Sequence, residues 1–291
     1  MRRQRLRGHG GFVRRCRVIG STASLLCVLI DPVMAADPVG SKTAPTSSPW
    51  HFLIAPYAWA YGIYGTVGFG RQSADVHASF LDILEHSDSL VALQGHVEIQ
   101  YDRFGIFLDG SYADMDASFH GEHFTSDVQQ QLVFLETGAF YRVIEDAPLW
   151  HPSPEIGGGA ISVDALAGAR YTYLNANTDN ALKVFDQTFR RDYDSTEDWW
   201  DPFIGGRLLL GLTKRFDFSL RGDVGGFNVG SDFTWNTQAM LGYHFSMWNA
   251  VGEVWAGYRA MGQDYDNGSG RKEFKWDVIL HGPILGMTVR W

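Results

Sequence analysis

The sequence predicts an all-β fold, a closed antiparallel transmembrane β-barrel of about ten strands, with eight to twelve strands compatible with the pattern. Three observations lead to this prediction. The N-terminal segment has the features of an export signal. No later stretch is apolar over the ~20 residues that a membrane helix needs. The rest of the chain alternates apolar and polar residues with the period of two that barrel strands show.

The export signal occupies the first 36 residues. An arginine-rich stretch ending at Arg17 is followed by a mostly apolar run over 18–30 and then by Val33, Met34, Ala35 and Ala36. Small residues suit signal peptidase, so we expect cleavage near Ala35 or Ala36. We therefore expect a signal peptide over 1–36, a flexible linker rich in proline and serine over 37–49, and the barrel over 50–291.

Removal of the signal changes the charge and the cysteine content of the chain. The whole chain has 24 basic and 33 acidic residues, and the part after the signal has 17 basic and 32 acidic residues, a formal charge of −15. Such acidity disfavours a nucleic-acid partner, because phosphate binding needs a basic surface. Both cysteines, Cys16 and Cys27, lie in the signal. The mature chain can form no disulfide and no thiolate metal site, and we expect no metal and no cofactor.

Ten segments carry the alternating pattern. The clearest runs from Leu93 to Tyr101, where Leu93, Gly95, Val97, Ile99 and Tyr101 alternate with Gln94, His96, Glu98 and Gln100. The predicted strands are 50–67, 89–102, 105–117, 128–144, 160–175, 202–213, 216–229, 233–246, 250–262 and 274–291. The longest connections, 68–88 and 176–201, follow odd-numbered strands, and short turns follow the second, sixth and eighth strands. This alternation is typical of barrels whose termini both face the periplasm.

The first long connection contains a helical pattern. Over 74–86, Val76, Phe80, Ile83 and Leu84 recur at helical spacing. We expect a short amphipathic helix between the first two strands. It could plug the mouth of the barrel, rest on its rim, or be an ordinary turn of an outer loop.

Charged residues occupy the strand faces opposite the apolar ones. Charge facing hydrocarbon is costly, whereas charges inside a narrow barrel can pair across the lumen. Three glycines, Gly168, Gly205 and Gly257, each lie two residues before an arginine and are expected to leave room for its guanidinium. A soluble sandwich with charges facing water remains an alternative. The predicted luminal charge network comprises Glu98, Asp109, Glu136, Arg142, Asp164, Arg170, Arg207, Arg221, Asp223, Glu253, Arg259 and Arg290.

These features together resemble a known class of protein. A signal peptide, alternating strands and a last strand ending in Trp291 are similar to the small single-chain outer-membrane β-barrels of Gram-negative bacteria. The stretches 50–59, 75–84 and 281–286 resemble a group of such barrels with no settled activity. The resemblance implies an outer-membrane address, lipids and lipopolysaccharide as partners, and recognition of the strand ending in Trp291 by the barrel-insertion machinery. It implies no substrate.

The function that we expect is structural or a narrow passage for small solutes, without enzyme activity, because side chains largely fill so small a lumen. One alternative is a surface hydrolase using Asp114, Asp116 and His120, as in the outer-membrane protease family. That family also needs a second Asp and His pair on a later strand, and no Asp-x-His follows Asp116 in this chain. A lipid-acting hydrolase would instead use Ser111 and His96. A third possibility is an adhesin acting through the acidic segment 176–201.

Overall fold

The computed structural model describes residues 49–70, 72–120, 124–148, 159–184, 187–247, 250–270 and 273–291. The predicted signal peptide and nearly all of the predicted linker lie outside these residues. Within them are one helix, α1 (Phe80–His86), and the strands β1 (Trp50–Trp59), β2 (Gly62–Phe69), β3 (Gln72–Ala78), β4 (Ser89–Tyr101), β5 (Phe104–His120), β6 (Phe124–Pro148), β7 (Ala160–Val184), β8 (Gln187–Gly211), β9 (Phe216–Gly226), β10 (Phe233–Met247), β11 (Ala250–Asn267) and β12 (Phe274–Arg290).

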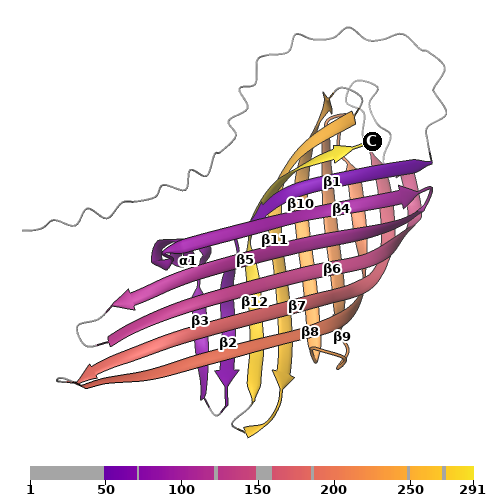
Figure 1. The fold of residues 1–291 in the computed structure, drawn as a ribbon. Coiled ribbons are helices and arrows are strands. Elements are labelled where there is room, and N and C mark those ends of the chain that lie inside the picture. The colour runs from indigo at the N-terminus through magenta and orange to yellow at the C-terminus, as the bar shows by residue number, and fades with distance from the viewer. Residues whose placement is uncertain are drawn as a thin grey trace, which may run out of the picture. The chain divides into compact units, whose positions relative to one another are not determined.

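The strands form a closed antiparallel barrel of ten strands, as predicted (Figure 1). The elements β1 and β2 are two halves of one barrel strand, interrupted at residues 60–61. Both halves pair with β12, with Tyr57 opposite Gly286 and Val67 opposite Trp276. Pairing of β12 with β1 closes the wall, and β3 extends it as a hairpin with β2.

The connections alternate between two ends of the barrel. One end, here called the terminal end, holds the start of β1, the last residue Trp291 and the short turns between β4 and β5 and between β8 and β9. The opposite end, called the far end, holds the connections after β2, β5, β7, β9 and β11. Connections that follow odd-numbered and even-numbered predicted strands therefore lie at opposite ends of one barrel.

The strands at the far end are longer than the sequence predicted. Pairing of β7 with β8 continues to Val184 opposite Gln187, so 176–201 is paired strand over its described residues and the predicted long loop is wrong. Backbone hydrogen bonds do not require an apolar face. Where neither face of a strand meets an apolar environment, the alternation that marks a strand disappears while the pairing continues.

The segment predicted to be a helix is partly a strand. Residues 72–78 form β3, and only Phe80–His86 are helical. Ser79 caps this helix in a reciprocal arrangement with Asp82, and the hydrogen bonds from Ser79 lower the pKa of the Asp82 carboxyl. None of the residues of α1 is buried, and Leu81 is 64% exposed. The helix therefore does not plug the lumen.

The outward face of the wall is apolar. On β4, Leu93 is 75% exposed whereas Gln94 is only 7% exposed. Other large apolar side chains exposed along the strands include Ile54, Val97, Ile99, Ile106, Leu108, Ile204, Leu220, Val224, Leu241, Val254, Ile279 and Leu285. Within the described ranges no helix is long and apolar enough to cross a membrane.

The half of the lumen toward the far end contains a large apolar cluster, which the sequence analysis did not predict. A buried cluster joins side chains of β6, β7 and β8 to side chains of β1, β11 and β12. Its members are Trp59, Leu132, Phe134, Leu174, Trp199, Met261, Tyr265, Phe274, Trp276, Val278, Leu280 and Ile284. In this half the barrel interior is packed like the core of a soluble protein.

A charge introduced on the outward face tests the assignment of faces. We expect Leu220→Arg, on β9, to destabilise the barrel by about 2 to 4 kcal/mol, because an arginine at mid-membrane must leave water. The measurement is denaturant unfolding in phospholipid vesicles. Val229→Arg, in the exposed turn after β9, is the control and should stay within about 0.5 kcal/mol of the parent. Equal tolerance of the two substitutions would contradict the lipid-facing assignment.

Candidate functional site

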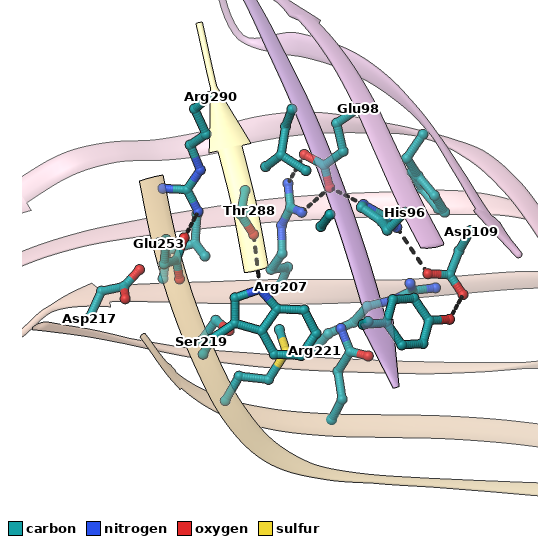
Figure 2. Close-up of a pocket in the computed structure, with 18 of the residues that line it drawn as sticks. His96, Glu98, Asp109, Arg207, Asp217, Ser219, Arg221, Glu253, Thr288 and Arg290 are labelled. Atoms are coloured by element: carbon teal, nitrogen blue, oxygen red, sulfur yellow. Dashed lines mark hydrogen bonds and ion pairs between the residues drawn. The ribbon is translucent and has the colours of Figure 1, made fainter. Parts of the chain in front are cut away.

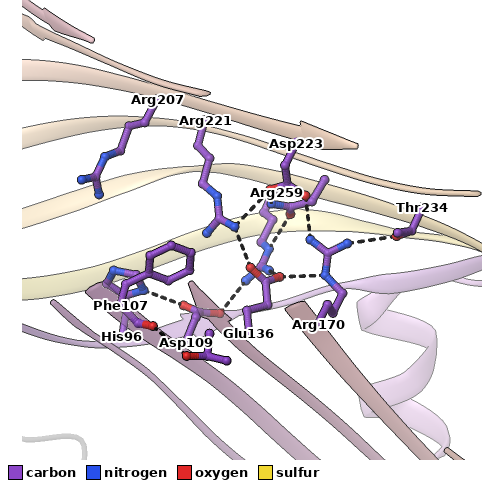
Figure 3. A network of polar contacts seen from close by, with 12 residues as sticks. His96, Phe107, Asp109, Glu136, Arg170, Arg207, Arg221, Asp223, Thr234 and Arg259 are labelled. Carbon is purple, nitrogen blue, oxygen red and sulfur yellow. Dashed lines mark hydrogen bonds and ion pairs between the residues drawn. The ribbon is translucent and has the colours of Figure 1, made fainter. Parts of the chain in front are cut away.

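The middle of the lumen is built around one carboxylate. Glu136, on β6, is fully buried. It accepts hydrogen bonds from Arg170 Nε at 3.0 Å, Arg221 Nη2 at 2.7 Å and Arg259 Nη2 at 2.8 Å (Figure 3). The three arginines come from β7, β9 and β11, so this one carboxylate joins strands from opposite sides of the wall.

Two further carboxylates complete this group. Asp223 accepts from Arg170 at 2.8 Å and lies 3.1 Å from Arg221, and Asp109 lies 3.3 Å from Arg259. We call Asp109, Glu136, Arg170, Arg221, Asp223 and Arg259 the central network. Its three carboxylates balance its three guanidiniums, which is the condition under which buried charges are tolerated.

Aromatic rings hold the guanidiniums of the central network in place. The Arg170 guanidinium lies 5.3 Å from the centroid of the Phe203 ring, and that of Arg259 lies 4.7 Å from the Trp59 ring. Arg221 lies 5.2 Å from the Phe107 ring. A cation over an aromatic face gains energy most when both are removed from water. The rings therefore stabilise the arginines and fill the space between them.

A second network lies next to the central one, toward the terminal end. It comprises Glu98, Arg142, Asp164 and Arg207. The buried Asp164 accepts from Arg142 Nε at 2.9 Å and from Arg207 Nε at 3.0 Å, and Arg207 also pairs with Glu98. His96 joins the two networks, with Nδ1 3.1 Å from Asp109 and Nε2 2.8 Å from Glu98.

The remaining two residues of the predicted network lie nearest the terminal end, where Arg290 Nη2 is 2.7 Å from Glu253 Oε2. Each of the twelve residues of the predicted luminal charge network is thus in an ion pair in the structure. The sequence reasoning missed the neutral partners. Tyr57 donates to Asp109, Asn236 donates to Asp223, and Thr234 accepts from Arg170. Only the shared strand face could have indicated them.

The glycines near the luminal arginines serve another purpose than the predicted one. A Cβ on Gly257 would come within 2.0 Å of the Ala239 backbone oxygen, and one on Gly205 within 2.3 Å of the Gly222 backbone oxygen. A Cβ on Gly168 would meet the Thr137 oxygen at 2.3 Å. The backbone of a neighbouring strand, and not a guanidinium, therefore lies closest to the position that a side chain would occupy. These glycines permit the strands to approach closely.

The terminal end of the lumen is hollow. A vestibule of about 470 Å³ is lined by His51, Gln100, Arg142, Ser162, His244 and Arg290, among others. A smaller cavity of about 100 Å³ lies between the second network and the side chains of β9–β12 (Figure 2). Beyond it, the central network and the apolar cluster fill the interior. The lumen is therefore accessible from the terminal end and obstructed farther in.

The structure separates the residues of the predicted surface hydrolase from the lumen. Asp114 and Asp116 lie on the face of β5 opposite to the buried Asp109 and Ser111. Asp114 accepts from Tyr112 and Asp116 from Ser89, each at 3.1 Å. The surface depression that they line contains Gln129, Gln130, Gln131, Asn175 and Asn177, with no histidine among the described side chains. The side chain of His120 lies outside the described ones.

The predicted lipid-acting pair is not assembled. Both ring nitrogens of His96 contact carboxylates, and Ser111 Oγ accepts from Gln94 Nε2 at 3.0 Å. Activation of a serine needs a histidine within hydrogen-bond reach of its hydroxyl. These two residues do not provide that arrangement here.

Comparisons with known proteins find similarity only among solved structures. No protein-family model matches the chain, and no curated protein matches it. Among solved structures it is similar to Ail, the attachment invasion locus protein of Yersinia pestis, at 12% identity over 84% of this chain and 100% of that chain, with a TM-score of 0.28. Neisserial surface protein A aligns at 11% identity over 84% and 96%, with a TM-score of 0.27. A Pseudomonas aeruginosa FadL homologue aligns at 8% identity over 83% and 90%, with a TM-score of 0.24. These values place the chain in no family.

Neutralising the central carboxylate tests the energetic importance of the network. We expect Glu136→Gln to lower the free energy of unfolding by about 3 to 5 kcal/mol, because three buried guanidiniums lose their shared counter-charge. The control is Glu145→Gln, which breaks only the exposed pair with Arg103 at 3.4 Å and should change stability by less than about 1 kcal/mol. Urea unfolding in vesicles measures both. Similar values for the two variants would refute a stabilising role of the network.

Proposed function

We propose that the protein is an integral outer-membrane β-barrel with a structural role, closed to solutes in its resting state. The observation that carries this proposal is the obstruction of the lumen by the central network around the fully buried Glu136, backed by the apolar cluster. A solute crossing the barrel would have to separate buried ion pairs that span the lumen. Neither the central network nor the apolar cluster leaves an open path of the kind that wide porins have.

The placement in a membrane is supported by the wall itself. A closed barrel satisfies its backbone hydrogen bonds between strands, which hydrocarbon requires. Large apolar side chains cover much of the outward face, and the twelve residues of the predicted luminal charge network lie inside. With the predicted signal peptide, this arrangement favours the outer membrane of a Gram-negative bacterium. The terminal end would then face the periplasm, the far end would meet lipopolysaccharide, and the strand ending in Trp291 would be read by the insertion machinery.

A non-enzymatic role agrees with the positions of the candidate catalytic residues. Asp114 and Asp116 face away from the lumen, and Ser111 is not paired with His96. A second candidate function, narrow passage of small solutes, is favoured by the vestibule of about 470 Å³ at the terminal end. Passage would need the central network to open. A barrel that passes solutes should therefore conduct ions, whereas a closed structural barrel should not.

Conductance measurements separate the two functions. We expect the protein in planar lipid bilayers to show no sustained channel current, because the network and the apolar cluster block the lumen in series. A porin inserted in the same bilayer is the positive control. A steady current proportional to voltage, carried by protein that shows the gel mobility of a folded barrel, would favour passage and overturn the closed state.

Tag accessibility tests the proposed orientation. We expect an epitope inserted at Gly268, in the far-end turn between β11 and β12, to be cleaved by protease added to intact cells. The matched insertion at Lys214, in the terminal-end turn between β8 and β9, should be protected until the cells are lysed. The reverse pattern would mean that the terminal end faces the outside of the cell, opposite to the proposed orientation.

A further inference from the structure

Charge balance changes along the lumen. The central network holds three carboxylates and three guanidiniums, and the second network holds two of each. At the terminal end, Asp217 and Glu253 are accompanied by Arg290 and by one histidine, His244. Within this group of four residues, there is one carboxylate more than the arginine neutralises.

Three residues at this end form a compact group, here called the terminal triad. Asp217, His244 and Glu253 come from the neighbouring strands β9, β10 and β11, and His244 is directly opposite Glu253 in the register. Each offers one ligand atom, and these atoms all lie within 4.8 Å of one another. Among the described residues this is the one such group of three. Asp217 Oδ1, His244 Nδ1 and Glu253 Oε2 are buried and have no hydrogen-bond partner, although Oε2 forms the ion pair with Arg290.

A glycine makes the space between the two carboxylates. Gly242 is opposite Asp217 in the register. A Cβ built on Gly242 would lie 2.2 Å from Asp217 Oδ1 and 2.2 Å from Glu253 Oε1. Both oxygens therefore converge on the position that any other residue would fill. The second oxygen of Glu253 is occupied by Arg290, as Figure 2 shows, so Oε1 is the oxygen left for a ligand.

We propose that the terminal triad binds a divalent transition-metal ion such as Zn²⁺, with one nitrogen and two carboxylate oxygens as protein ligands. Mixed imidazole and carboxylate donors suit such ions, whereas Ca²⁺ and Mg²⁺ prefer oxygen alone. The Asp217 carboxylate supplies the negative charge that Arg290 does not offset, and it would partly neutralise the ion. The cavity and the vestibule, both lined by Asp217, provide an entry path and room for water as a further ligand. This site is additional to the proposed structural role and does not depend on it.

The test is Zn²⁺ binding by the protein purified from membranes in detergent, followed near neutral pH by competition with a coloured chelator. We expect saturable binding of one ion per chain. His244→Gln and Asp217→Asn should each weaken it about a hundredfold, since loss of even an outer-shell partner typically costs 10- to 100-fold. Gly242→Ala, which keeps all three ligands, should also weaken it by filling the space between the carboxylates.

Two controls keep the result interpretable. His51→Gln removes an exposed histidine from the same vestibule and should leave the affinity unchanged. Heat-modifiable gel mobility shows which variants remain folded, and only those are compared. Absence of saturable Zn²⁺ binding by the parent protein would overturn the proposal. So would unchanged affinity in a folded His244→Gln or Asp217→Asn variant.

Discussion

The contact of three arginines with the Glu136 carboxylate is the interaction on which the rest of the lumen depends. A carboxylate removed from water needs counter-charge and hydrogen bonds, and the wall nearest Glu136 supplies only Arg170. The other two guanidiniums reach it from β9 and β11, across the interior. Formation of the network therefore requires the barrel to be closed. Once formed, the network holds distant strands of the wall together.

This requirement arranges the interior in layers. Toward the terminal end, space remains for water in the cavity and the vestibule. Toward the far end, β6–β8 approach β11 and β12 closely enough for Trp199 and Tyr265 to stack with centroids 4.0 Å apart. Beside this apolar cluster, the buried Asp201 carboxylate is held by hydrogen bonds from Trp199 Nε1 and Ser231 Oγ. The central network forms the boundary between the apolar cluster and the cavity, with its guanidiniums on aromatic rings.

The sequence was most informative where one strand face is polar and the other is not. Glu98 and Leu93 illustrate this case, and the strand alternation together with the cost of charge in hydrocarbon was enough to predict the barrel and its ten strands. The apolar layer could not be predicted, because Leu132 and Val133 are both apolar and a period of two cannot assign them to faces. The terminal triad was missed for a different reason. Its three residues meet only through the register of three strands, which no local pattern contains.

Exposure to water distinguishes the charges that can exchange partners from those that cannot. Glu136 and Arg170 have no exposed side-chain area, so any change of partner there would leave a buried charge alone. The Arg290 side chain is 41% exposed, and water can take over its hydrogen bonds when it moves. A pair of this kind contributes little to stability. The terminal end of the lumen, where the triad lies, is therefore the part of the charged interior that can accept a ligand without unfolding the barrel.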